Sequence, residues 1–246
     1  MPDFHDTIEF LRLHQRLSRA ALAASADISA SHLDKFINNR TTPGSETFTK
    51  LAHAFDLDPA QRQHLHELWL PARDLPSAAE LCQRLTDPSV QAHLDDLDSR
   101  HVLAVYLDPL RTVLHGNRIF HKSVPGLAEA DNNYLLWMFS RVARDNIDDW
   151  ETEIRHAVTI ARGTFGRYRD LPRARSLFRK LRATPEFPRF WNSTPMQVAY
   201  GCHRPAPINL RAPCTNQPLS LSLEISEYDP DVLIANGTYD TLAIAC

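Results

Sequence analysis

The sequence has 246 residues, of which 43% are hydrophobic and 23% are charged, and its formal net charge is −3. This length allows one large domain or two modest ones, and the composition is that of an ordinary soluble protein. No apolar run reaches the ~18 residues of a membrane helix, and the acidic N-terminus lacks the core of a signal peptide. We therefore expect a cytoplasmic protein with no membrane partner.

The sequence motifs of common enzymes (GxSxG, GxGxxG and the Walker A loop) are absent, so we expect no catalysis and no cofactor. The four cysteines form no CxxC pair, and the twelve histidines show no metal-ligand spacing, so we expect no metal site. Cys202 is followed by His203 and Arg204, cations that could stabilise a thiolate. Neighbouring residues of a strand point to opposite faces, which favours an inert thiol. A redox role for Cys202 or Cys214 stays open.

The first 70 residues predict a compact bundle of five short helices, because apolar residues recur there at helical spacing. We place this all-α domain at residues 1–70, a helical linker at 71–100 and a second domain at 101–246. The predicted helices are 4–14, two short helices on either side of a tight turn at Asp27, 45–55 and 59–69, followed in the linker by 77–85 and 88–97.

The segment from Leu17 to Pro43 predicts a helix-turn-helix. Ser18 and Ser29 stand where each helix begins, and their hydroxyls can cap free backbone amides. The second helix buries Leu33 and leaves small and polar side chains outside, which suits a DNA major groove. A solvated helix face would show the same pattern. The candidate DNA-binding residues are Arg19, Ser29, Ser31, His32, Lys35, Asn38 and Arg40.

The charge of this domain does not favour general phosphate binding. Residues 1–70 contain seven Lys/Arg and nine Asp/Glu, a net charge of −2. Affinity for DNA depends largely on phosphate contacts, so these must come from a few placed groups. Residues 162–189 are the strongly basic stretch, with nine Lys/Arg against Asp170 and Glu186. Three interpretations of that stretch remain: a solvated helix face, a DNA-phosphate contact, or an anchor for the carboxylate of an acidic ligand.

The second domain predicts an α+β fold. Residues 101–108 and 111–116 predict a hairpin around Asp108. Strands at both ends with helices between them suggest that the ends pair in one sheet. The predicted helices are 133–143, 149–165, 172–182 and 185–191, and the predicted later strands are 196–202, 218–226 and 231–237.

Residues 17–43 resemble the helix-turn-helix of XRE (Cro/cI-like) regulators, whose pattern is close to L-S-Q-x-x-L-A-x-x-A-G-I-S-x-S-x-L-S-x-L-E-x-G-x-x-x-P. The chain departs from this pattern at Arg19, Asp27, Ile37 and Asn39. Asp and Asn tolerate the left-handed backbone usually taken by Gly, and Ile37 is expected to join the core. The residues in register are Leu17, Ser18, Leu22, Ala23, Ala26, Ile28, Ser29, Ser31, Leu33 and Pro43.

The second half is similar to the MmyB-like ligand-binding domain over 102–117, 132–139 and 148–191, with Asn117, Trp150, Phe187 and Trp191 at its most recognisable positions. This resemblance implies a PAS-like domain that encloses a small apolar ligand, with fatty acids the suspected class for the family. Aromatic and aliphatic residues of the domain are candidates for lining such a pocket, although core packing explains them equally well. The candidate ligand-binding residues are Tyr106, Leu114, Asn117, Trp137, Phe139, Phe165, Trp191 and Tyr200.

The sequence therefore predicts a multidomain transcriptional regulator: an all-α helix-turn-helix bundle followed by an α+β PAS-like ligand-binding domain. Its expected partners are double-stranded DNA, a small apolar ligand and a second copy of the chain, since such regulators bind DNA as two-fold dimers. The alternative is a small-molecule-binding or catalytic α+β protein whose helical N-terminus makes protein contacts.

Overall fold

The structure is a computed structural model that describes residues 1–200, 206–211 and 217–240. Its Cα positions form two compact units. The first comprises residues 1–73, 162–175 and 196–200, and the second comprises 74–161, 176–195 and the described residues beyond 200. Cys202, His203, Arg204 and Cys214, which were considered for a redox role, lie outside the described residues.

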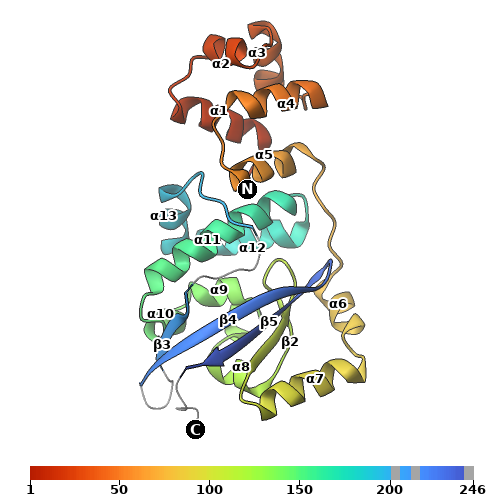
Figure 1. Cartoon of the computed structure of the whole chain (residues 1–246), viewed down its shortest axis with the longest axis vertical. Helices are drawn as coiled ribbons and strands as arrows, with labels where there is room; N and C mark the ends of the chain where they lie inside the picture. The colour runs from red at the N-terminus through yellow and green to blue at the C-terminus, as the bar shows by residue number, and fades with distance from the viewer. Residues whose placement is uncertain (201–205, 212–216, 241–246) are drawn as a thin grey trace. The chain divides into compact units, whose positions relative to one another are not determined.

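The first unit contains the predicted helix-turn-helix bundle (Figure 1). Its core is built from fully buried side chains of successive helices, among them Leu22, Leu33 and Leu51. Ile37 is partly buried against this core, as its place in the sequence suggested. All five helices were predicted, and they are α1 (Phe4–His14), α2 (Arg19–Ser25), α3 (Ala30–Asn39), α4 (Ser45–Ala54) and α5 (Pro59–Trp69).

Local sequence explains where α2 and α3 begin. The hydroxyl of Ser18 accepts a hydrogen bond from the Ala21 amide at 3.0 Å, and Ser29 accepts one from the His32 amide at 3.1 Å. These bonds satisfy donors that have no partner within the first helical turn. Asp27, between the two helices, has a φ of 49°, which confirms a left-handed residue at the turn.

The end of α3 differs from the prediction. Asn39 was expected to replace a left-handed glycine, but it is the last helical residue, and the left-handed position belongs to Arg40 with a φ of 52°. That conformation costs a residue with a Cβ roughly 1–2 kcal/mol. The prediction was therefore wrong by one position, and the contacts of Arg40 become relevant to how the turn is held.

The second unit contains one antiparallel sheet of five strands in the order β2-β1-β5-β4-β3. The first and last parts of the domain pair directly, because Val105 on β1 lies opposite Ala235 on β5, as predicted. Asp108 is fully buried and accepts the Thr112 amide at 2.8 Å, which closes the predicted hairpin. The strands are β1 (Leu103–Leu107), β2 (Val113–Gly116), β3 (Ile208–Arg211), β4 (Pro218–Asp229) and β5 (Val232–Tyr239).

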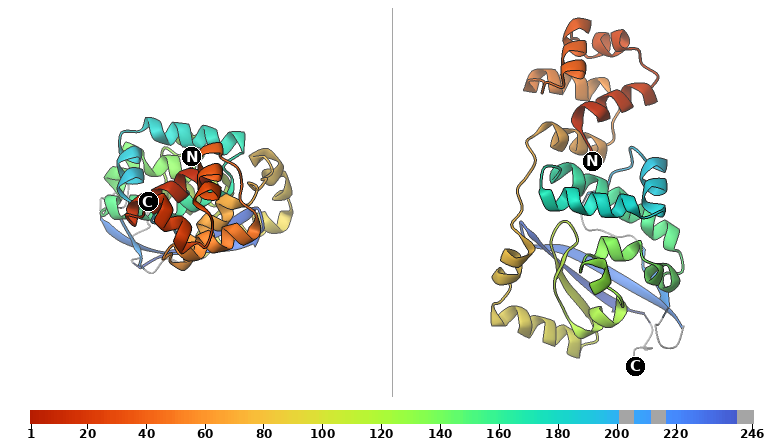
Figure 2. Two further views of the ribbon diagram at one scale, coloured as in Figure 1. Left: turned by 90° about the horizontal axis from the view of Figure 1, so that it is seen from above. Right: turned by 180° about the vertical axis from the view of Figure 1, so that it is seen from behind.

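Helices cover this sheet on the side that faces away in Figure 1. In the view of Figure 1, β4 and β5 lie in front of α8 and α9. The view from behind in Figure 2 shows the same helices in front of the strands. The remaining helices are α6 (Ala78–Arg84), α7 (Pro88–Ser99), α8 (Arg118–Ser123), the 3-10 helix η1 (Ala128–Ala130), α9 (Tyr134–Met138), α10 (Arg141–Asn146), α11 (Trp150–Arg167), α12 (Pro172–Ala183) and α13 (Glu186–Ser193).

The predicted helix 133–143 and several short elements of the second domain differ from the prediction. The segment 133–143 is two helices, because Ser140 caps a new start by accepting the Ala143 amide at 3.2 Å. The last turn of α9 is closed by Trp150, whose indole N–H donates to the Met138 carbonyl at 2.8 Å. Helix α8 and strand β3 were not predicted, since each is too short to show a clear period.

The predicted strand at 196–202 was wrong over its described part, 196–200, which is turn and irregular chain. An alternating pattern needs a neighbouring strand to bond with, and here side chains bond the backbone instead. Gln61 donates to the Met196 carbonyl at 3.2 Å, and Arg162 donates to the Gln197 carbonyl at 2.7 Å. Over the part of the chain that the structure describes, no helix has the length and apolar character needed to cross a bilayer.

Candidate DNA-binding surface and ligand-binding domain

Helix α3 presents a polar surface over an apolar base. Leu33 and Phe36 are buried in the bundle, at 0% and 2% exposure. On the outer side the predicted base-reading residues Ser31, His32 and Lys35 are all exposed. Lys35 is the one lysine or arginine within α3, and it makes no ion pair with any residue that the structure describes. The helix therefore offers donors and acceptors of the kind that read base edges in a major groove.

Arg19, at the start of α2, is bound to acidic and polar neighbours. Its guanidinium lies 3.0 Å from an Asp34 carboxylate oxygen and 3.5 Å from one of Glu9. It also donates to the side-chain oxygen of Asn38 at 3.2 Å. The structure thus brings two predicted DNA-binding residues, Arg19 and Asn38, into direct contact. The positive charge of Arg19 is balanced within the protein.

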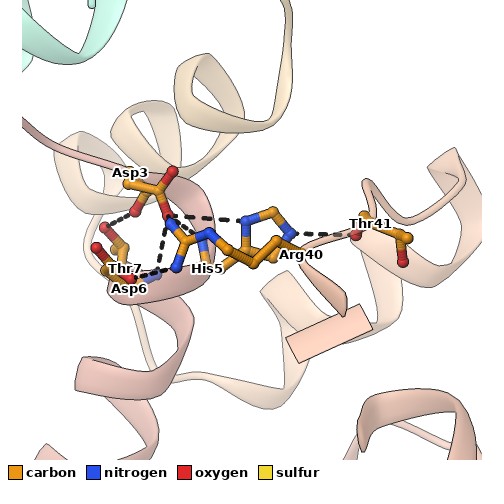
Figure 3. Close-up of polar contacts among 6 residues, drawn as sticks. All are labelled: Asp3, His5, Asp6, Thr7, Arg40 and Thr41. Atoms are coloured by element: carbon orange, nitrogen blue, oxygen red, sulfur yellow. Dashed lines mark hydrogen bonds and ion pairs between the residues drawn. The ribbon is translucent and has the colours of Figure 1, made fainter. Parts of the chain in front are cut away.

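Arg40, at the end of α3, is held in the same way by α1 (Figure 3). Its two terminal nitrogens lie 2.5 Å from Asp3 and 2.9 Å from Asp6, and next to it His5 contacts the Thr41 carbonyl at 3.1 Å. Burial alone would raise the pKa of Asp3, but the Asp6 amide and the Arg40 charge outweigh it and lower that pKa. Hydrogen bonding to Asp6 in turn raises the pKa of Arg40. These bonds hold the side chain of the left-handed residue against the start of α1.

A second group of polar contacts, which sequence reasoning missed, joins α5 to residues 162–175 and 196–200 of the same unit. Its centre is Glu67, whose side chain is 11% exposed. One carboxylate oxygen pairs with Arg167, with Nε at 3.0 Å, and the other accepts the hydroxyl of Tyr200 at 2.8 Å. The charged Glu67 raises the pKa of Tyr200, although burial contributes more to that shift. We call Glu67, Arg167, Tyr200 and His64 the Glu67 network.

His64 completes this network from the preceding turn of α5. Its Nδ1 lies 3.2 Å from the Tyr200 hydroxyl. Because the single hydroxyl proton goes to Glu67, His64 must donate from Nδ1 to Tyr200. The imidazole is 2% exposed, and burial lowers its pKa to about 4. His64 is therefore neutral at physiological pH, and its role here is structural.

Two glycines of α11 make room for the Glu67 network. A Cβ at Gly163 would lie 2.9 Å from the ring of Tyr200, and one at Gly166 would lie 2.6 Å from the ring of His64. Glycine within a helix costs roughly 0.5–1 kcal/mol relative to alanine, which is offset here by close packing. Gly163 near the end of the predicted helix 149–165 and Gly166 just beyond it were the signal in the sequence that could have indicated this contact.

Three predicted ligand-binding residues lie on or beside β1 and β2. Tyr106 is 1% exposed, and its hydroxyl lies 3.0 Å from Nδ1 of His93 on α7. Leu114 is buried on β2. Asn117 caps α8 by accepting the Phe120 amide at 3.0 Å and also accepts the Ala104 amide of β1. The side chain of Asn117 therefore has a structural role, and its role in ligand binding stays a prediction.

The other predicted ligand-binding residues divide between the two units. In the second unit, Phe139 and Trp191 both contact Phe187, with ring centroids 5.4 and 5.2 Å from it. Trp137 is buried, and its indole N–H donates to the Pro125 carbonyl at 2.7 Å. Phe165 and Tyr200 belong to the first unit. Phe139 and Trp191 thus belong to one aromatic cluster around Phe187. Tyr106 is not part of it and contacts His93 on α7.

One surface hollow lies in the helical bundle, between α4 and α5. Its volume is about 670 Å³, and its lining includes Phe48, Leu57, Arg62 and His66. None of the predicted ligand-binding residues lines it. Over the described residues, no three His, Cys, Asp or Glu side chains gather as a metal site would require.

A helix-turn-helix bundle followed by an α+β domain defines this chain as a DNA-binding transcription regulator with a ligand-binding domain. Two family models match it: a helix-turn-helix over residues 8–61, and the MmyB-like transcription regulator ligand binding domain over residues 86–213. The second match covers just over half of the chain, which therefore belongs to the MmyB-like transcription regulator family, as its sequence suggested. No curated protein matched the chain.

Proposed function

We propose that the protein binds a specific DNA sequence through α3 and changes its DNA affinity when a small apolar ligand occupies its second domain. In this proposal Ser31, His32 and Lys35 contact base edges. The carrying observation is the polar outer side of α3, where all three are exposed above the buried Leu33 and Phe36. Such a helix enters the major groove with its N-terminal residues against the bases.

Backbone phosphates would be held by Arg19, Ser29 and Arg40, with Asn38 close to Arg19. Both arginines are bound to carboxylates in the free protein, so a phosphate has to replace these partners. This exchange costs little free energy, because partly exposed ion pairs contribute only about 0–1 kcal/mol each. The protein would act in the cytoplasm as a homodimer, on half-sites separated by one helical turn of DNA or a multiple of it.

The proposed ligand is a small apolar molecule, and fatty acids are the first class to test. Family membership and the aromatic cluster around Phe139, Phe187 and Trp191 support this proposal. A ligand changes DNA affinity only if it binds two protein states with different affinities. Both matched domains belong to regulators, which favours this role over catalysis.

The DNA proposal is tested by gel-shift titration of the full chain against the DNA flanking its own gene. Lys35→Ala removes one expected base contact. It should weaken the free energy of binding by roughly 1–3 kcal/mol, which raises Kd about five- to 150-fold. Lys122→Ala is the control, because it removes the same charge from an exposed position of α8. If Lys35→Ala binds as tightly as Lys122→Ala, α3 does not read the bases.

The ligand proposal is tested by native mass spectrometry of the purified protein, followed by thermal unfolding with myristate and palmitate. We expect a bound lipid mass or a rise of the melting temperature, since a ligand that binds only the folded state stabilises it. The absence of both the added mass and the thermal shift would reject fatty acids as the ligand class.

A further inference from the structure

The basic stretch 162–189 consists of two structurally different parts. In its first part the arginines make contacts within the first unit: Arg162 donates to the Gln197 carbonyl, Arg167 pairs with Glu67, and Arg169 donates to the Gly166 carbonyl. In its second part, on α12, the basic side chains of Arg179, Lys180 and Arg182 are exposed. We call these three residues the α12 basic end.

Helix α12 separates this charge from a buried apolar side. Leu177, Phe178 and Leu181 are buried, at 7%, 5% and 0% exposure. The helix contains no acidic residue. Lys180 lies 2.6 Å from Asp131, in a pair of which both side chains are more than half exposed. Arg179 and Arg182 make no ion pair with any residue in the described ranges.

Helix stability does not explain this arrangement fully. Cations in the last turn interact favourably with the helix dipole, which accounts for part of the charge. However, Arg179 precedes Arg182 by three residues, a spacing at which like charges repel by about 0.2–0.5 kcal/mol, whereas Arg175, four residues before Arg179, is paired with Asp170 at 2.7 Å. A Glu at either position would have relieved that repulsion. Arg179 and Arg182 have no carboxylate partner among the described residues, which leaves both guanidinium groups available to an anionic partner outside the helix.

The charge balance of the helix-turn-helix indicates which partner this surface fits. Four of its seven Lys/Arg residues are paired with carboxylates: Arg12, Arg19, Arg40 and Lys50. Half to two-thirds of protein–DNA hydrogen bonds go to phosphate and sugar, so a DNA-binding domain with a net charge of −2 is short of phosphate contacts. Arginine supplies these best, because its planar fork matches phosphate oxygens.

We propose that the α12 basic end binds the DNA backbone outside the half-site that α3 reads. This inference rests on the proposed DNA-binding function. Once α3 is bound, a contact between the α12 basic end and the flanking DNA forms within one complex rather than from free solution, so even two or three weak phosphate contacts add to the affinity. The contact adds affinity and salt dependence without adding base preference.

The experiment compares two variants of the full chain with equal charge changes. Arg179→Gln/Arg182→Gln removes the proposed contact. Arg100→Gln/Arg141→Gln is the control, since those arginines are 64% and 92% exposed and, among the described residues, each pairs with an exposed aspartate four residues away. Each is titrated over a range of salt against the shortest duplex that contains the nuclease footprint, and against a duplex extended by ~10 bp on each side.

On the extended duplex we expect Arg179→Gln/Arg182→Gln to lower the slope of log K against log salt by about 2 per protomer, and therefore by about 4 for the homodimer, close to one unit per lost phosphate contact. On the shortest duplex the two variants should agree. Arg179→Lys/Arg182→Lys keeps the charge and should keep the wild-type slope, which also controls for folding.

Equal slopes for the two Gln variants on the extended duplex would overturn the inference and leave the proposed function intact. An equal loss on both duplexes would also overturn it, because the contact would then lie within the half-site. If the wild-type chain does not prefer the footprinted site over a scrambled duplex, the proposed function itself fails, and the inference fails with it.

Discussion

The hydroxyl of Tyr200 donates to Glu67 at 2.8 Å across 133 residues of sequence. Glu67 belongs to α5 of the helix-turn-helix bundle, whereas Tyr200 lies within the residues matched by the ligand-binding family model. The first compact unit is therefore built from both matched regions. Residues 162–175 and 196–200 therefore contribute directly to the packing around α5.

Tyr200→Phe should lower the free energy of unfolding by about 1–3 kcal/mol, because Glu67 loses a donor and the Nδ1–H of His64 loses its acceptor. Urea denaturation of the full chain, followed by fluorescence, measures the change. Tyr228→Phe is the control, since Tyr228 is 50% exposed and makes no hydrogen bond through its hydroxyl with the described residues.

The same series can include Glu67→Gln and the double variant Glu67→Gln/Tyr200→Phe. Residues in one hydrogen-bond network show coupling energies of about 0.5–3 kcal/mol. Strictly additive effects of the two substitutions would contradict the contact between Glu67 and Tyr200.

The buried His64 should make stability depend on pH. Burial lowers its pKa to about 4 from 6.5, so between these values the unfolded chain binds a proton that the folded chain does not. The contribution of neutral His64 to the free energy of unfolding is fully present above pH 6.5. It is lost as the pH falls towards 4, at up to ~1.4 kcal/mol per pH unit. His64→Gln should have a flatter curve over that window. Parallel stability curves for the wild type and His64→Gln would refute this assignment.

Gly166→Ala should destabilise the protein although alanine favours helices. The added Cβ would lie 2.6 Å from Cε1 of His64, a ring fixed by burial and by Tyr200. We expect a loss of about 1–3 kcal/mol from the overpacking, against a helix gain of at most about 1 kcal/mol. Unfolding midpoints of Gly166→Ala in the wild-type and the His64→Ala backgrounds provide the check. Removing the ring should reverse most of the loss, and an equal loss in both backgrounds would argue against the clash.

The sequence predicted the features that depend on local interactions. Ser18, Ser29 and Asp27 act on backbone within a few residues, so the start of each helix and the turn between them followed from residue type alone. The pairing of β1 with β5 also followed, since strands at the two ends of a domain commonly meet in one sheet.

Contacts between distant residues could not be predicted in this way. The residues around His64 and Glu67 form no motif that would single them out, and their partners lie about a hundred or more residues further on. The alternation at 196–200 predicted a strand, but no pattern within a segment shows whether a neighbouring strand exists. The carboxylates that hold Arg19 and Arg40 lie up to 37 residues away from them in the sequence. Counting charges therefore predicted the net charge of the domain but not which residues form ion pairs.

Asp6→Asn should strengthen DNA binding, because it weakens the hold of α1 on Arg40. Asp6 is suited to this test, since Asp3 also caps α1 and its loss would disturb the helix. The Arg40–Asp6 pair is more than half exposed on both sides, so it contributes at most about 1 kcal/mol, and Kd should fall by up to about fivefold. Asp56→Asn is the control for the general effect of one charge, because Asp56 is exposed and has no ion pair among the described residues. Gel-shift titration of both variants at one salt concentration measures the difference. Equal affinities for Asp6→Asn and Asp56→Asn would mean that Arg40 does not exchange Asp6 for a phosphate.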